Sequence, residues 1–203
     1  MNEQMWWYLS RASGLVAWAV AMASVAWGTA LATRALGQRP KAPWLLDLHR
    51  HLGGLTVAFV GLHLGALVAD SYVHFGWADV FVPWASSWKA TAVAWGVIAW
   101  WLLVAIEVTS LLMKRLPKRL WRGVHLSSYL VALLSTAHLF TAGTDATSRL
   151  VVGAAVAVVA VLVFFLLYRE LHPAKRRSRA AAARTARAAQ RTVVVPARSV
   201  IHS

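Results

Sequence analysis

Four histidines lie in segments built almost entirely of apolar residues: His49, His63, His125 and His138. An ionisable side chain in an apolar segment that crosses a membrane is costly, so it marks a functional site by default. The sequence has no cysteine, which excludes disulfides, thiolate metal sites, iron-sulfur clusters and thioether-attached haem. A bound metal therefore has to be held mainly by histidine.

The spacing of these histidines puts them at two matched levels. His49 and His63 are 14 residues apart, which in a helix gives about 21 Å of rise and only about 40° of rotation. His125 and His138 are 13 residues apart, a rise of about 19.5 Å. Two opposed neutral imidazoles at equal depth are what six-coordinate haem b requires. The spacing thus predicts two stacked haem sites.

The 13-residue spacing also raises a difficulty, because it turns an ideal helix by about 220°. His125 and His138 can share a face only if the helix between them is kinked, tilted or bulged. Hydroxyl side chains that can assist by bonding to the backbone lie in this stretch: Ser127, Ser128, Ser135 and Thr136.

The elements that position these residues are predicted to be membrane spans, because 59% of the residues are hydrophobic and the chain is more apolar than a soluble domain needs. Five runs are long enough to cross a bilayer as helices. They cover residues 9–33, 45–69, 88–113, 120–142 and 149–168. The predicted fold is an all-α integral membrane bundle of five helices, residues 1–168, followed by a basic tail, residues 169–203.

The basic residues set the predicted orientation. All but three of the 21 Lys and Arg residues flank the first connection, the third connection or the end of the fifth span. The exceptions, Arg11, Lys89 and Arg149, lie at the opposite ends with Asp70, Asp79 and Asp145. The positive-inside rule places the N-terminus outside and the C-terminus in the cytoplasm of a multi-pass protein of the inner (plasma) membrane. The N-terminus lacks the basic region of a cleavable signal peptide, so we expect the first span to be retained.

A net charge of +14 suggests nucleic acid as a partner, but the charges are confined to short stretches, which argues against a nucleic-acid-binding face. We expect the tail to be disordered or a helix on the surface of anionic lipid.

Three further residues leave alternatives open. His51 competes with His49 as the inner ligand, although its 12-residue spacing to His63 gives about 120° of rotation. Arg122 lies one turn before His125 and either pairs with a haem propionate or serves only as a positive-inside residue. Glu107 is the one acid well within a span, where a structural role is favoured over proton handling.

The pattern Leu-His-Arg with a histidine 14 positions on, then Arg-Leu-Trp-Arg-Gly-Val-His with a histidine 13 positions on and Gly-Thr-Asp after it, resembles the ferric reductase-like transmembrane domain. This family includes ferric reductases, NADPH oxidases and the haem subunit of bacterial methionine-sulfoxide reductase. The resemblance covers about residues 9–168 and is closest to short, actinobacterial-looking members. It implies that His49 and His125 bind an inner haem b and that His63 and His138 bind an outer one.

The chain departs from longer family members, which have six spans and a flavin- or nicotinamide-binding domain. No Gly-rich phosphate loop follows a strand pattern here, so we expect no flavin or nicotinamide site in this chain. The predicted function is electron transfer from a separate donor protein or a membrane quinol to an extracytoplasmic acceptor, which is ferric iron, oxygen or a redox partner protein. The alternatives are a one-haem anchor subunit of a reductase and a non-redox, histidine-lined metal transporter.

Overall fold

The structure, a computed structural model, describes residues 4–33, 43–71, 75–171, 182 and 184–185, and within these ranges it is helical with no strand. The all-α prediction is confirmed. The helices are α1 (Gln4–Thr33), α2 (Pro43–Ala69), α3 (Trp77–Phe81), α4 (Ala90–Leu111), α5 (Lys118–Leu126), α6 (Ser128–Ala142) and α7 (Arg149–Leu171). The short helix α3 was not predicted. Most of the predicted basic tail lies outside the described residues.

Four stretches of the described chain are long and apolar enough to cross a membrane: α1, α2, α4 and the combined stretch Lys118–Ala142. They correspond to the first four predicted spans. The fifth predicted span coincides with α7, whose apolar part within the described residues is the shorter stretch Arg149–Phe165. A membrane protein with a helical bundle is therefore supported, whereas the fifth span and the orientation remain predictions.

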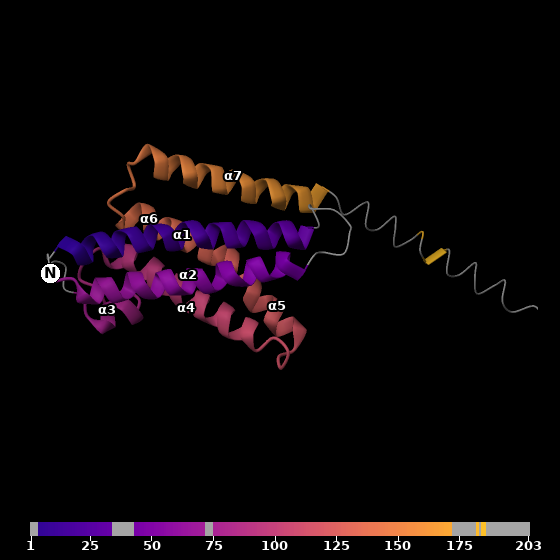
Figure 1. Cartoon of the computed structure of the whole chain (residues 1–203), viewed down its shortest axis with the longest axis horizontal. Helices are drawn as coiled ribbons and strands as arrows, with labels where there is room; N and C mark the ends of the chain where they lie inside the picture. Colours follow the sequence, from indigo (N-terminus) through magenta and orange to yellow (C-terminus); the bar gives the residue numbers. More distant parts are fainter. Residues whose placement is uncertain (1–3, 34–42, 72–74, 172–181, 183, 186–203) are drawn as a thin grey trace, which may run out of the picture.

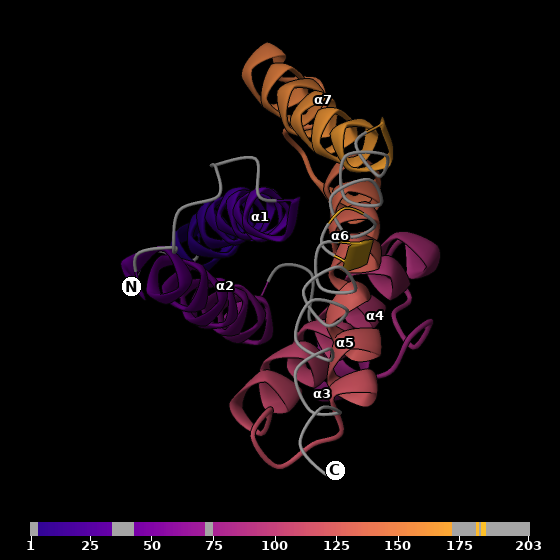
Figure 2. The ribbon, with the colours of Figure 1, turned by 90° about the vertical axis from the view of Figure 1, so that its right-hand side faces the viewer.

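The helices lie side by side with their axes roughly along one direction (Figure 1). The helices α1 and α2 form a closely packed hairpin, α4 packs against α6, and α7 covers the outer side of α1. Seen along the bundle, the α1–α2 pair faces the group formed by α4, α5 and α6 (Figure 2). This arrangement brings α2 and α6, the helices that carry His63 and His138, onto opposite sides of one interior space.

Small side chains allow the helices to approach, as is usual for helix packing inside a membrane. One buried cluster joins α1, α6 and α7 through Trp18, Ala21, Met22, Ala132, Leu139 and Ala155. Hydrogen bonds also join α1 to α6: Trp18 Nε1 donates to Thr136 Oγ1 at 3.0 Å, and the hydroxyls of Thr29 and Tyr129 are 2.9 Å apart. These contacts fix α6 against the first hairpin.

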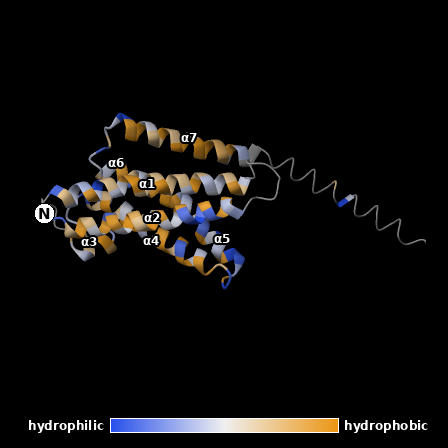
Figure 3. Ribbon diagram, in the orientation of Figure 1, coloured by the Kyte–Doolittle hydropathy of each residue, from blue (hydrophilic) through white to orange (hydrophobic). Residues whose placement is uncertain are grey.

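Large apolar side chains are also exposed on the outside of the bundle. The ribbon in Figure 3 is orange, for hydrophobic residues, along much of the long helices. Leu150 is 86% exposed, Leu111 is 82% exposed and Leu133 is 65% exposed. In water such an apolar surface is unfavourable, whereas lipid tails solvate it. The hydrophilic residues gather instead near the ends of the helices, and α5 carries several of them.

The predicted break between His125 and His138 is present at Ser127. Helix α5 ends at Leu126 and α6 begins at Ser128, with Ser127 at φ −64° and ψ −7°. The Ser127 amide donates to the Val124 carbonyl at 3.0 Å, and the Ser127 hydroxyl donates to the same carbonyl at 2.6 Å. This tight turn interrupts the regular α-helical hydrogen bonding between His125 and His138. Both residues, although 13 positions apart, lie against a histidine of α2.

Candidate functional site

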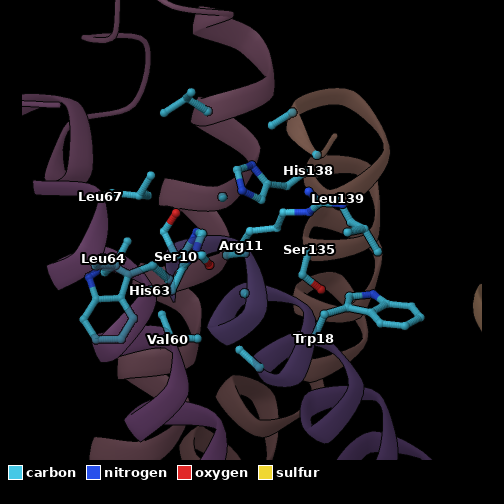
Figure 4. A pocket seen from close by; sticks show the side chains of 18 of the residues that line it. Ser10, Arg11, Trp18, Val60, His63, Leu64, Leu67, Ser135, His138 and Leu139 are labelled. Carbon is cyan, nitrogen blue, oxygen red and sulfur yellow. The ribbon is translucent and has the colours of Figure 1, made fainter. Parts of the chain in front are cut away.

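The outer histidine pair consists of His63 on α2 and His138 on α6. Their ring centroids are 6.4 Å apart and the ring planes are inclined by 79°. Two metal–nitrogen bonds of about 2 Å, plus half an imidazole ring on each side, separate the centroids by about 6–6.5 Å. The pair therefore has the separation that one iron atom between two axial imidazoles requires. Figure 4 shows both rings directed into the interior cavity.

Backbone carbonyls hold both rings of the outer pair. His63 Nδ1 lies 2.6 Å from the Ser10 carbonyl oxygen, and His138 Nδ1 lies 2.8 Å from the Ala92 carbonyl oxygen. A carbonyl oxygen only accepts hydrogen bonds, so Nδ1 is the protonated nitrogen in each ring. Each Nε2 is then left with a lone pair for a metal, as is common for metal-binding histidines.

Glycines on neighbouring helices make room for three of the four rings. A Cβ atom built on Gly14 would lie 2.9 Å from His63 Nδ1, and one built on Gly96 would lie 2.8 Å from His138 Nδ1. A Cβ on Gly28 would lie 2.9 Å from Cε1 of His49. The sequence pattern did not single out these glycines. The signal it offered was the 14-residue spacing of Gly14 and Gly28 along α1, which equals that of His49 and His63.

The inner pair consists of His49 on α2 and His125 on α5, with ring centroids 5.9 Å apart and ring planes inclined by 77°. The Ser24 hydroxyl lies 3.4 Å from His49 Nδ1, and the Trp121 ring stacks on His125 at a centroid distance of 5.2 Å and an angle of 25°. His125 Nδ1 is buried and has no hydrogen-bond partner among the residues that the structure describes. The two histidines of each predicted pair thus lie next to each other. The rings of the outer pair are both held by backbone hydrogen bonds, whereas those of the inner pair are not.

A cavity of about 260 Å³ lies at the outer pair and is bounded by α1, α2, α4 and α6. Its walls are mainly apolar and include Val60, Leu64, Leu67 and Leu139 (Figure 4). Such walls exclude water and lower the dielectric around a bound redox group.

Arg11 and Asp145 also border the cavity and form a bidentate ion pair between α1 and the α6–α7 connection. The Arg11 guanidinium holds the pKa of Asp145 below its usual value, chiefly through these hydrogen bonds. Arg11 is therefore already paired with a carboxylate.

The remaining candidates lie apart from the paired rings. His51 is exposed, and its Nδ1 is 2.7 Å from the Asp47 carbonyl oxygen of its own helix, so the His49–His125 pair does not include it. Arg122 is exposed on α5, three residues before His125.

The described residues contain no group of three or more His, Cys, Asp or Glu placed to hold a metal ion. Axial ligation of haem needs only two protein ligands, so the pairs fit haem better than a bare ion.

Comparison with known families gives one match. The profile described as "Ferric reductase like transmembrane component" matches residues 13–136. The matched stretch contains His49, His63 and His125 and ends two residues before His138. No curated protein and no solved structure matches the chain.

Proposed function

Because the chain belongs to the ferric reductase like transmembrane component family, we propose that it is a b-type dihaem cytochrome that carries single electrons across a membrane. Membership of this family supports the assignment of the chain as a membrane component of a redox system. Haem binding is typical of the family. The observation that carries the finer proposal is the pair of opposed imidazole couples, with centroids 5.9 Å and 6.4 Å apart.

In this proposal His63 and His138 would hold the outer haem through their ring nitrogens, and His49 and His125 would hold the inner one. Haem b, when bound, supplies reversible one-electron chemistry at its iron. The chain's own residues hold and orient it: the Ser10 and Ala92 carbonyls fix the two outer rings, and Gly14 and Gly96 leave space behind them. The apolar cavity wall keeps water away from the outer site.

The electron donor in this proposal reaches the inner pair from the cytoplasmic side. Exposed basic residues surround the α4–α5 turn, on the side of His125 away from the outer site: Lys114, Arg115, Lys118, Arg119 and Arg122. Such a cluster suits an acidic donor protein, whereas a membrane quinol would arrive through the lipid. The acceptor at the opposite face is ferric iron, oxygen or a redox partner protein.

A one-haem anchor subunit of a reductase is the second candidate, and the asymmetry of the two pairs favours it. Both outer rings have a backbone partner within 2.8 Å, whereas His125 Nδ1 has no partner within the described part of the chain. In this version only the outer pair binds haem, and the protein serves to dock another subunit.

Haem content and redox difference spectra of the purified protein test the proposal. We expect two haems per chain, with one spectral component removed by either His63→Ala or His138→Ala and the other by either His49→Ala or His125→Ala. His51→Ala is the matched control and should keep both components. One haem per chain would support the anchor subunit instead. The absence of b-type bands would favour a non-redox protein such as a metal transporter.

A further inference from the structure

Glu107 is an acidic side chain in the last two turns of the apolar helix α4, four residues before its end at Leu111. The other acids of the described chain are Asp47 near the start of α2, Glu170 near the end of α7, and Asp70, Asp79 and Asp145, which lie outside the long helices. Glu107 is half-buried, and within the described part of the chain its carboxyl group makes no hydrogen bond or ion pair. Placing a carboxyl group in apolar surroundings without a partner costs free energy, so a functional role is the first hypothesis for Glu107.

The carboxyl group of Glu107 on α4 points toward α2, where Gly53 has no side chain and leaves space for it. A Cβ atom built on Gly53 would lie 2.5 Å from Glu107 Oε1, so no larger residue fits at position 53 without displacing the carboxyl group. Gly53 is buried. The close approach of the carboxyl group to α2 therefore depends on the absence of a side chain at this position.

The register of α2 places this contact beside the inner histidine pair. Gly53 follows His49 by four residues and precedes His63 by ten, which corresponds to about 6 Å and about 15 Å of helix rise. Four residues are about one helical turn, so Gly53 and His49 lie on similar faces of α2. Glu107 thus lies one turn from the inner level, on the side toward the outer pair.

A charge that arrives at the inner level acts on Glu107 through a medium of low dielectric. One added electron makes the surroundings more negative, which favours the protonated carboxylic acid over the carboxylate. We propose that Glu107 is a redox-linked proton site, which binds a proton when an electron enters the inner site and releases it when the electron leaves. This inference rests on the proposed function, since it requires a redox group between His49 and His125.

The step balances with one electron and one proton. The donor loses one electron, which reduces the inner iron from the ferric to the ferrous state. One proton from cytoplasmic water adds to a carboxylate oxygen of Glu107. The net charge of this part of the membrane interior is then unchanged. When the electron passes on to the outer site, the inner site is oxidised again and Glu107 releases its proton.

Other titratable or charged groups lie on the elements packed against α4, so the test has to separate them from Glu107. Two of the groups near the cytoplasmic end of α2, Asp47 and Arg50, are exposed and pair with each other at 3.1 Å. The groups are Asp47, His49, Arg50, His51 and His63 on α2, Asp79 on α3, Lys118, Arg119, Arg122 and His125 on α5, Tyr129 and His138 on α6, and Lys114 and Arg115 beyond the end of α4.

The test is a redox titration of the purified, haem-loaded full chain at several pH values. The inner component is identified as the one that His49→Ala removes. In the unchanged protein we expect its reduction to become up to tenfold less favourable per unit rise in pH, a slope of up to 59 mV for one electron and one proton. The slope should disappear in Glu107→Gln and persist in Glu107→Asp. The matched control Asp47→Asn removes an exposed acid of α2 and should keep the slope.

A second measurement does not depend on haem. A hydrophobic carbodiimide modifies protonated carboxyl groups in apolar surroundings, so mass spectrometry should find Glu107 modified in the unchanged chain and no label on that peptide in Glu107→Gln. If Glu107→Gln does not assemble with haem, a labelled Glu107 and a pH slope in Glu107→Asp support the proton site, whereas a missing label or a missing slope overturns it. A pH slope that survives in Glu107→Gln, or a slope absent from the unchanged protein, would overturn the inference. Absence of haem from the unchanged protein would instead overturn the proposed function.

Discussion

Replacing Gly96 by alanine tests the site at the point where its space is most restricted. A Cβ at position 96 would lie 2.8 Å from Nδ1 and 2.9 Å from Cε1 of His138, whereas ordinary contact begins at 3.4 Å. The His138 ring would have to move by about 0.6 Å, which exceeds the tolerance of about 0.5 Å expected of a functional constellation. The movement would also strain the 2.8 Å hydrogen bond to the Ala92 carbonyl.

The expected magnitude follows from the cost of overpacking, about 1–3 kcal/mol. If that cost falls on the ligating orientation of His138, haem binds about 5- to 150-fold more weakly at the outer site. Helix propensity acts in the opposite sense, since alanine is favoured over glycine by about 1 kcal/mol in a helix. The folded bundle should therefore survive the substitution while the outer haem is weakened.

The assay is haem titration of the haem-free protein, followed by difference spectra that separate the outer from the inner component. Gly65→Ala is the matched control, because a Cβ there has no atom within 4 Å although the residue lies on α2 two positions after His63. Gly14→Ala should weaken the same outer component, since its Cβ would lie 2.9 Å from His63 Nδ1. The reasoning is refuted if Gly96→Ala binds outer haem as tightly as Gly65→Ala, or if it weakens only the component that His49→Ala removes.

Two further predictions concern the two ends of the bundle. Asp145→Asn removes the ion pair with Arg11, which is worth about 1 kcal/mol or less at a partly exposed position. The pKa of Asp145 is lowered in the folded protein, so the stabilisation is present above the unfolded pKa of about 3.9 and is lost as the pH falls through the folded value. Thermal unfolding should separate the two proteins at pH 6, and the difference should begin to shrink near about pH 4 and vanish only below the lowered pKa of the folded protein; a constant difference would contradict the assignment. Arg119→Glu should slow reduction by an acidic donor protein and weaken its dependence on salt, while the matched reversal Arg149→Glu at the other end leaves both unchanged. An unchanged rate in Arg119→Glu would indicate that the donor does not dock on this basic cluster.

The sequence by itself determined the levels of the site along the membrane normal. The rise per residue of a helix is constant, so the spacings of 14 and 13 residues are enough to place His49 with His125 and His63 with His138. The absence of cysteine indicated that a bound metal would be held mainly by histidine, and the apolar runs indicated an all-α membrane protein. The need for a break between His125 and His138 also followed from helix geometry alone.

Only the tertiary structure decided which residues surround the rings. Helix periodicity is local, whereas the neighbours of a helix and its rotation depend on packing between segments far apart in the chain, such as Arg11 and Asp145, 134 positions apart. The sequence therefore did not reveal that Ser127 is the place of the break, that Gly14, Gly28 and Gly96 make room for three rings, or that Glu107 lies against Gly53. These features exist because side chains from different helices compete for the same interior space.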